Sequence, residues 1–433
     1  MLDVSCGPEV GHLFNVAGQT PRFQNPLSSV RRAKKWISIF MLETPARIEP
    51  CGLEEAVPEA LSELVVKIRM EAEALGSGLH EDTVAGLRVV MRIANSHFSN
   101  LIEGHIVNPC DIERAVEGRL DEVENSVLAQ EAATHVEAQS WVDEVVANGA
   151  VPTSAAFIRE IHRRFFETLP AALRIAGHGI LRRGIVPGEY RAKGNEVSVG
   201  RHIPPSAHRV EAFMAHFERR YFGLTRGARG RVLSIPAAHH RLNFIHPFDD
   251  GNGRVSRLMS HAMCQAAGIG GRGLWSISRG LARGLRDPLE YKQRMEAADQ
   301  PRRGDRDGRG NLSLATLEGF TSWFLSVMYE QLLYSKDLFN SASLCERYIA
   351  LVRETFPDQN GSPNLVFHLF HHGEMAFEDA CHMLGASRRP VLQELSDQGF
   401  LKQVSATCPV RLAFPLEHHQ RLFPKLFQLS DSV

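Results

Sequence analysis

The chain has 433 residues and a formal net charge of −1, with 43% hydrophobic and 23% charged residues. This length exceeds one ordinary hydrophobic core, so two or three domains are expected. The composition is that of a globular protein and excludes a disordered or fibrous class. The balanced charge excludes a chain that coats nucleic acid or anionic lipid through its net charge. Contact with such partners would have to occur through a local charged patch.

The cysteines and the hydropathy pattern narrow the cellular setting. Seven cysteines occur singly, without a CxxC pair, and therefore predict neither a zinc site nor a disulfide framework. No apolar run approaches the about 20 residues that a membrane helix requires. We therefore expect a cytoplasmic protein with no membrane partner.

The first part of the chain divides into a tail and a helical region. Residues 1–45 show no sustained period and are expected to form a poorly ordered tail. Residues 46–150 have a helical apolar period, and the stripe that includes Val84 and Phe98 ends before Gly104. Glycine suits the left-handed conformation that follows a helix end, so a helix is expected to end there.

Residues 151–338 are expected to form a second helical region, the core of the protein. Between two predicted helices, residues 190–203 alternate apolar and polar residues after a Gly-Asn turn, which predicts a small β-hairpin. Further on, a predicted helix enters at Ser234, and a second helix begins near Asn252. The helical period then resets near residue 340, where a domain boundary is expected.

Residues 339–433 are expected to form a winged-helix-like domain. The predicted order is helices at 345–355, 363–370, 377–384 and 388–398, then a hairpin around 407–409. Arg388 and Arg389 would lie on the recognition helix, but Glu394 and Asp397 follow them. A protein contact or homodimerisation is therefore preferred, and DNA contact stays open as the alternative.

The connector at residues 246–257 (HPFDDGNGRVSR) is suited to binding phosphate. Gly251, Asn252 and Gly253 precede a helix, so their backbone N–H groups can converge at its positive end. Glycine also lacks the Cβ atom that would block the approach of an anion.

Four side chains of the connector supply the remaining chemistry. Asp250 offers a hard oxygen ligand suited to Mg²⁺. Arg254 and Arg257 are three residues apart on the helix and can both meet phosphate oxygens. His246 is the side chain type whose ordinary pKa of about 6.5 suits proton removal at neutral pH. Because phosphoryl-type transfer needs mainly positioning and charge stabilisation, this set suffices for it.

These residues match the Fic signature HxFx(D/E)GNGRxxR at every fixed position, and the chain resembles Fic/Doc protein adenylyltransferases over roughly residues 85–330. The resemblance implies an all-α fold with a small β-hairpin flap. It also implies ATP as substrate, Mg²⁺ as cofactor, and AMP transfer to a Ser, Thr or Tyr hydroxyl of a target protein. The residue assignments that it implies are His246 as base, Asp250 as Mg²⁺ ligand, Asn252 as α-phosphate contact, and Arg254 and Arg257 as outer-phosphate contacts. Gly253 matters because the related Doc-type kinases carry lysine there and phosphorylate instead.

Residues 188–205 resemble the Fic flap, whose exposed strand pairs with an extended segment of the target. The flap residues expected to bind the target are Arg191, Val197, Ser198 and Val199. The stretch lacks the commoner Gln-Asn-Trp-Ile-Gly-Gly sequence, so the family's target preferences do not transfer. A plain surface hairpin is the alternative.

The string SNLIEG, from Ser99 through Glu103 to Gly104, resembles the family's inhibitory motif (S/T)xxxE(G/N). An acidic residue in the last turn of a helix is disfavoured by the helix dipole, so Glu103 breaks a local rule, as functional residues often do. The resemblance implies a salt bridge from Glu103 to Arg257 that denies the γ-phosphate its seat. Tyr291 resembles a family position near the adenine, with ordinary packing as its alternative.

The sequence therefore predicts an autoinhibited enzyme that transfers AMP to a protein substrate with an exposed hydroxyl. Two alternatives stay open. The same site could remove AMP from a modified protein, with Glu103 orienting a water molecule. The chain could instead be a nucleotide-sensing transcription regulator that acts through its winged helix.

Overall fold

The computed structural model describes residues 43–53, 57–177, 182–359, 361–385, 389–402, 405 and 407–429. Residues Thr44–Val433 form one compact unit. Most of the described residues are helical, which confirms the all-α prediction. The predicted tail at 1–45 lies almost wholly outside the described residues.

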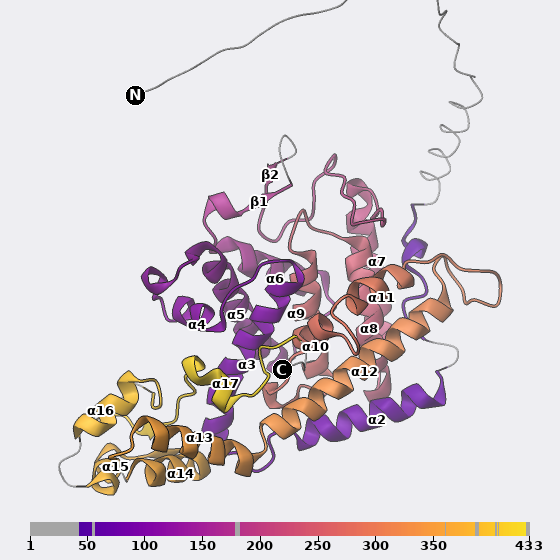
Figure 1. Cartoon of the computed structure of the whole chain (residues 1–433). Helices are drawn as coiled ribbons and strands as arrows, with labels where there is room; N and C mark the ends of the chain where they lie inside the picture. Colours follow the sequence, from indigo (N-terminus) through magenta and orange to yellow (C-terminus); the bar gives the residue numbers. More distant parts are fainter. Residues whose placement is uncertain are drawn as a thin grey trace, which may run out of the picture. The chain divides into compact units, whose positions relative to one another are not determined.

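Figure 1 shows the helices in chain order, with a long connection between α6 and α7 that carries β1 and β2. Before residue 150 they are α2 (Glu59–Ala74), α3 (Glu81–Ile102), α4 (Pro109–Val116) and α5 (Ser126–Ala147). The next are α6 (Ala155–Glu167), α7 (Val210–Leu224), α8 (Ala228–Ile245), α9 (Asn252–Ala266), α10 (Ile277–Arg283), α11 (Glu290–Ala298) and α12 (Leu314–Leu338). The last are α13 (Ser341–Thr355), α14 (Ser362–His372), α15 (Phe377–Leu384), α16 (Arg389–Asp397) and α17 (His419–Leu422). Short 3₁₀ turns are η1 (Pro45–Ile48), η2 (Leu120–Glu122), η3 (Ala171–Leu173), η5 (Ala207–Arg209), η6 (Gly271–Gly273) and η7 (Leu416–His418).

Helix α3 shows how local sequence sets the bounds of a helix. The His80 side chain caps its start by accepting a hydrogen bond from the Asp82 backbone N–H at 3.3 Å. The acidic residues Glu81 and Asp82 in the first turn favour the positive end of the helix dipole. The helix ends at Ile102, and Gly104 has a φ of 91°, as the C-terminal glycine signal predicts.

The pair α8 and α9 carries the predicted connector between them. Helix α8 begins at Ala228, earlier than the predicted start at Ser234, and Pro236 lies inside it. Val232 and Ile235 on this helix are buried, so tertiary packing outweighs the usual cost of an internal proline. The connector then runs from the end of α8 to the start of α9, where the sequence predicted it.

The β-structure of the core is smaller than predicted and differently placed. Strands β1 (Ile175–Ala176) and β2 (Arg183–Gly184) pair antiparallel. The predicted hairpin at 190–203 is reduced to one bridge, in which Val199 and His202 exchange backbone hydrogen bonds of 3.0 and 2.9 Å. Elsewhere in and next to this segment, side chains form hydrogen bonds with backbone groups that would pair with backbone groups in a β-ladder. For example, the Glu196 carboxylate accepts a hydrogen bond from the backbone N–H of Ala207 at 3.2 Å.

The C-terminal part has helices close to the four that the sequence predicted, but also a strand between the second and third of them and a short helix, α17, at the end, neither of which was predicted. Strand β3 (Glu374–Met375) lies between α14 and α15 and pairs antiparallel with β4 (Val410–Arg411). A further bridge joins Leu401 to Leu412. Residues 386–388, which include one of the two predicted recognition arginines, lie outside the described residues. The winged-helix and domain assignments stay predictions.

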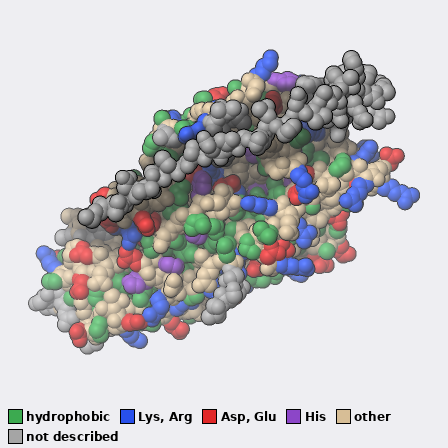
Figure 2. Space-filling view, turned by 45° about the horizontal axis from the view of Figure 1, so that its top comes forward, with side chains coloured by type: hydrophobic (Ala, Val, Ile, Leu, Met, Phe, Trp, Pro, Cys, Tyr) green, Lys and Arg blue, Asp and Glu red, His purple; other side chains and the backbone are tan. Residues whose placement is uncertain are grey.

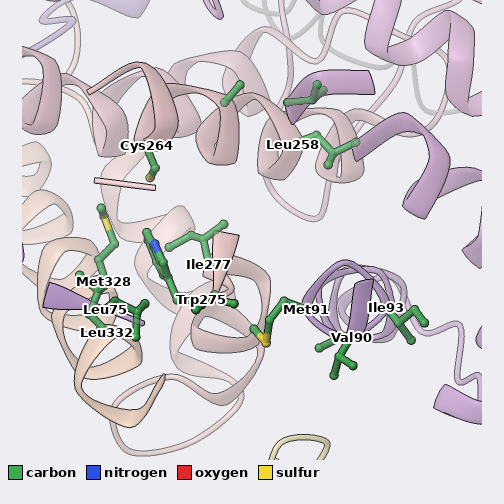
Figure 3. Packing of buried hydrophobic residues seen from close by; sticks show 14 of the residues in the cluster. Leu75, Val90, Met91, Ile93, Leu258, Cys264, Trp275, Ile277, Met328 and Leu332 are labelled. Carbon is green, nitrogen blue, oxygen red and sulfur yellow. The ribbon is translucent and has the colours of Figure 1, made fainter. Parts of the chain in front are cut away.

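One extended hydrophobic core holds these helices together. Figure 3 shows Met91 of α3, Cys264 of α9, Ile277 of α10 and Met328 of α12 directed into the same packed region. All four side chains are at most 4% exposed. Helix α2 runs beside α12 in Figure 1, which brings residues far apart in sequence into this core.

The surface reflects the nearly neutral composition. Figure 2 shows basic and acidic side chains interspersed over the visible face. Among the described helices we find none with both the length and the apolar character needed to span a bilayer.

Candidate active site

The connector between α8 and α9 is anchored by its aromatic residue. His246 ends α8 in the left-handed conformation, with a φ of 50°, and the chain turns sharply there. Phe248 is fully buried, and its ring stacks on His162 of α6 with a centroid distance of 3.9 Å. The Gly188 backbone N–H donates to Nδ1 of His162 at 2.9 Å, so the connector, α6 and the flap segment are joined at one point.

Asn252 closes the connector on itself. Its side-chain oxygen accepts a hydrogen bond from the Phe248 backbone N–H, and its side-chain nitrogen donates to the Phe248 carbonyl, both at 2.9 Å. The side-chain oxygen of Asn252 can accept one further hydrogen bond, and its side-chain nitrogen can donate one more. The predicted contact of Asn252 with the α-phosphate therefore remains compatible with this geometry, but the contacts present are those that shape the loop.

Both glycines of the connector occupy positions where a side chain would collide. Gly251 has a φ of 76°, and a Cβ atom there would lie 2.7 Å from the Phe166 ring. A Cβ atom on Gly253 would collide with the Glu103 carboxylate. The missing side chains at the start of α9 therefore let the Phe166 ring and the Glu103 carboxylate approach the backbone closely.

Asp250 has the donor set and exposure that a magnesium ion would use. Its side chain is half exposed, and its Oδ1 accepts the Gly251 backbone N–H at 2.6 Å. Mg²⁺ keeps several waters and usually takes one or two carboxylates together with substrate phosphates. The half-exposed carboxylate of Asp250 fits that requirement, although Arg254 lies 3.6 Å from it.

The predicted contact between Glu103 and Arg257 is present. Arg257 Nη2 donates to Glu103 Oε1 at 2.6 Å, and its Nε donates to Ser99 Oγ at 2.9 Å. Ser99 on α3 and Glu103, the residue directly after α3, therefore contact the same guanidinium group. Burial acts to raise the pKa of Glu103, but the charge of Arg257 outweighs it and holds that pKa below its usual range.

Arg254 has a different set of partners, which the sequence did not predict. Its Nη1 contacts Oε1 of Glu131 on α5, and its Nη2 lies 3.6 Å from Asp250 Oδ2. The guanidinium carbon sits 4.4 Å from the centre of the Phe165 ring. His105 Nδ1 lies 2.9 Å from the other Glu131 oxygen. No sequence motif surrounds Glu131, so its contact with Arg254 could be recognised only from the structure.

His246 is held by Arg191 in a partly buried position. Arg191 Nε donates to the His246 carbonyl at 2.8 Å, and its backbone N–H donates to the Pro247 carbonyl at 2.9 Å. Burial, assisted by the charges of Arg191 and His202, lowers the pKa of His246 to about 4. The ring is therefore neutral at physiological pH.

This geometry corrects the prediction for Arg191. We expected an exposed flap residue that binds the target, but its side chain is 2% exposed and bonds to the connector. A buried guanidinium must find acceptors, and the backbone carbonyls at the end of α8 supply them. Arg191 therefore supports the connector from inside the protein.

Tyr291 is joined to the centre of the site through histidine. Its hydroxyl lies 2.7 Å from His239 Nε2, and His239 Nδ1 lies 2.9 Å from Ser260 Oγ of α9. Burial raises the pKa of Tyr291 to about 12, so it stays protonated. The residue packs and also borders the cavity described next.

A cavity of about 570 Å³ opens beside the connector. Its lining residues are Ile102, Glu103, Val199, Gly200, Arg201, His202, Asn243, Phe244, His246, Gly253, Arg257, Tyr291, Lys292, Met295, Glu296 and Asp299. This volume is within the usual range for small-molecule sites, about 300–1,000 Å³. The predicted residues that do not line it are Ser99, Gly104, Arg191, Val197, Ser198, Asp250, Gly251, Asn252 and Arg254. Lys292, His202 and Asp299 line it without having been predicted, since no local motif marks them.

Residues 152–264 match the model of the Fic/DOC family, which confirms the predicted resemblance. The chain is similar to proteins named Protein adenylyltransferase Fic from Aedes aegypti and Drosophila ananassae. With the first it is 31% identical over 154 residues, which cover 36% of this chain and 27% of that protein. With the second it is 28% identical over 200 residues, which cover 44% of this chain and 36% of that protein. The matched part thus spans about a quarter to a third of these relatives' length.

Two solved structures align with this chain at low sequence identity. A Fic family protein from Desulfovibrio desulfuricans aligns with a TM-score of 0.49 and 17% identity, and covers 83% of this chain and 97% of that chain. A Fic domain containing signaling protein from Bacteroides thetaiotaomicron aligns with a TM-score of 0.48 and 17% identity, over 64% of this chain and 97% of that chain.

Proposed function

We propose that this protein transfers AMP from Mg-ATP to a Ser, Thr or Tyr hydroxyl of a target protein. The observation that carries this proposal is that His246, Gly253 and Arg257 line one cavity at the start of α9. A base, an anion-binding backbone and a cation for phosphate oxygens thus meet around one space. The relatives named as protein adenylyltransferases support the same assignment.

His246 acts as the base in this reaction. Its neutral ring accepts the proton of the target hydroxyl while the hydroxyl oxygen attacks the α-phosphorus of ATP. A new P–O bond forms as the bond between the α-phosphorus and its bridging oxygen breaks, and pyrophosphate leaves. The proton remains on the imidazole, whose pKa rises when the phosphate charges of ATP lie beside it.

The surrounding residues hold the phosphates in place. The backbone at the start of α9 binds phosphate oxygens, and Arg257 neutralises the outer phosphates once it is released from Glu103. A magnesium ion held by Asp250 would neutralise further phosphate charge. The flap residues Val197, Ser198 and Val199 would pair with an extended target segment, and Val199 already borders the cavity.

Glu103 would act as a brake on this reaction. It takes the Nη2 group of Arg257 at 2.6 Å, the donor that an outer phosphate requires. Glu103→Gly is therefore expected to raise AMP transfer, by about tenfold or more if releasing the ion pair is worth 1.4 kcal/mol. A matched control is Glu124→Gly, which makes the same replacement at an exposed turn residue.

The test is incubation of purified protein and cell lysate with ATP labelled at the α- or the γ-phosphate. We expect protein-bound label from α-labelled ATP alone, increased by Glu103→Gly, unchanged by Glu124→Gly, and abolished when His246→Ala is added to Glu103→Gly. Label from γ-labelled ATP would indicate phosphorylation and contradict the proposal. Absence of label from folded Glu103→Gly protein with both nucleotides would contradict transfer altogether.

A further inference from the structure

The two arginines of the connector are in different environments. Arg257 lines the 570 Å³ cavity and meets Glu103 there, whereas Arg254 is 2% exposed and is not among the lining residues. Arg254 is directed toward α5 and the aromatic rings of α6. Arg254 therefore lies on the side of the connector that faces away from the cavity.

A buried arginine remains charged, because its guanidinium does not lose its proton in proteins. It requires a carboxylate or a comparable acceptor to offset the cost of burial. Among the described residues, Arg254 forms ion pairs with two carboxylates. Glu131 is in direct contact through Oε1, and Asp250 lies 3.6 Å from Nη2.

The environment of Glu131 is arranged to keep its charge. Its side chain is 13% exposed, and His105 lies 2.9 Å from the oxygen that Arg254 does not use. Burial acts to raise the pKa of Glu131, but His105 and Arg254 outweigh it and hold that pKa below its usual range. The carboxylate is therefore ionised at neutral pH and offsets the charge of Arg254.

We propose that Glu131 is a positioning residue that neutralises Arg254 and thereby keeps Asp250 available for a divalent cation. Asp250 directly precedes the N-cap residue of α9 and Arg254 lies in the first turn, where their side chains approach to 3.6 Å. Without the Glu131 charge, Asp250 is the carboxylate left next to a buried cation. Arg254 would then compete with the metal for the same oxygens.

This inference rests on the proposed function, because it assumes that Asp250 binds the metal of a metal–nucleotide complex. The measurement is the affinity for ADP by calorimetry, with Mn²⁺ present and with a chelator present, in the Glu103→Gly background. The ratio of the two affinities gives the enhancement by metal. This ratio separates an effect on the metal from a general loss of nucleotide binding.

Glu131→Gln is expected to reduce the enhancement by about tenfold, within the range of coupling between neighbouring charged groups. The matched control is Glu137→Gln, which neutralises an exposed glutamate on the same helix and should leave the ratio unchanged. Adding Arg254→Gln to Glu131→Gln removes the competing cation, and should restore the ratio to within about twofold of the background value.

An unchanged ratio in Glu131→Gln would overturn the inference, and so would a ratio that stays low in the double variant. If Glu131→Gln binds ADP more tightly than the background protein in the presence of the chelator, Glu131 instead keeps Arg254 away from phosphate. That result would also overturn the inference. If Glu131→Gln does not fold, Arg254→Gln alone should keep the ratio at or above background, and a tenfold fall would overturn the inference. Failure of the background protein to bind ADP with Mn²⁺ would instead overturn the proposed function, and this inference with it.

Discussion

At the scale of single residues, the position of His246 decides what it can do. The residue ends α8 with a left-handed backbone, so its ring leaves the helix direction and borders the cavity. Its carbonyl is fixed by Arg191. The motif identified His246 as a candidate base. The contact with Arg191, which is 55 positions away in sequence, could be recognised only in the structure.

The lowered pKa of His246 gives a prediction for its titration. Because burial and nearby positive charge lower the pKa to about 4, the neutral base form should persist through the neutral range and disappear as the pH falls through about 4. An ordinary histidine would instead be half protonated near pH 6.5.

Nuclear magnetic resonance of the labelled imidazole rings checks this prediction between about pH 8 and pH 5. The His246 signal is assigned by its loss in His246→Ala. We expect that signal to show less than about one tenth protonation at pH 5, which follows from a pKa near 4. A titration midpoint near 6.5 in the folded protein would contradict the expectation.

At the scale of elements, helix α3 has two contacts of different kind. Its C-terminal end carries the contact from Glu103 to Arg257, beside the cavity. Its N-terminal half packs against the C-terminal part of the chain, where Thr83 Oγ1 donates to the Phe370 carbonyl at 3.3 Å. One rigid helix therefore connects the C-terminal residues with the site.

Gly86 permits the close approach of α3 to this C-terminal part. A Cβ atom on Gly86 would lie 2.8 Å from Cε2 of the Phe414 ring. Gly86→Ala should therefore lower the free energy of unfolding by about 1–3 kcal/mol, although alanine is the better helix former by about 1 kcal/mol. Urea unfolding followed by circular dichroism measures this change.

The control for that experiment is Gly319→Ala in α12, where an added Cβ atom would meet nothing within 4 Å. This substitution should stabilise the protein by up to about 1 kcal/mol, since it gains helix propensity without a collision. Equal stabilisation by both alanines would show that the ring of Phe414 moves freely and that the contact does not limit α3.

At the scale of the whole molecule, buried arginines join distant segments. Arg279 of α10 is 2% exposed and donates to the carbonyls of Leu426 at 2.9 Å and Lys425 at 3.0 Å. Its Nη1 donates to Gln331 Oε1 at 2.7 Å. The residues after α17 are thereby fastened to the same core that carries the connector.

Arg279→Met should lower the free energy of unfolding by about 2–4 kcal/mol, because it leaves buried carbonyls without their charged donor. Hydrogen exchange of the amides in residues 416–429 should rise together with this loss. The control is Arg353→Met at an exposed position of α13, which should change neither quantity measurably. Slow exchange in 416–429 despite Arg279→Met would show that other contacts hold the segment.

The sequence alone determined the helical class and the reactive connector. Helical periods are local and repeat every 3.6 residues, and most predicted helices occur within a few residues of their expected bounds. The connector could be recognised because the residues proposed as base and metal ligand lie with the glycines and arginines within 12 consecutive positions. The contact from Glu103 to Arg257 followed from the family resemblance, since no local rule connects the two residues.

The tertiary structure decided which predicted residues face the cavity and which support it. Arginine is usually exposed, yet Arg191 and Arg254 are both buried and contact acceptors from distant segments. The pairing of Arg254 with Glu131 spans 123 positions and has no sequence signature. Burial and long-range charge pairing depend on how helices pack together, and a single sequence carries no local pattern that reports this packing.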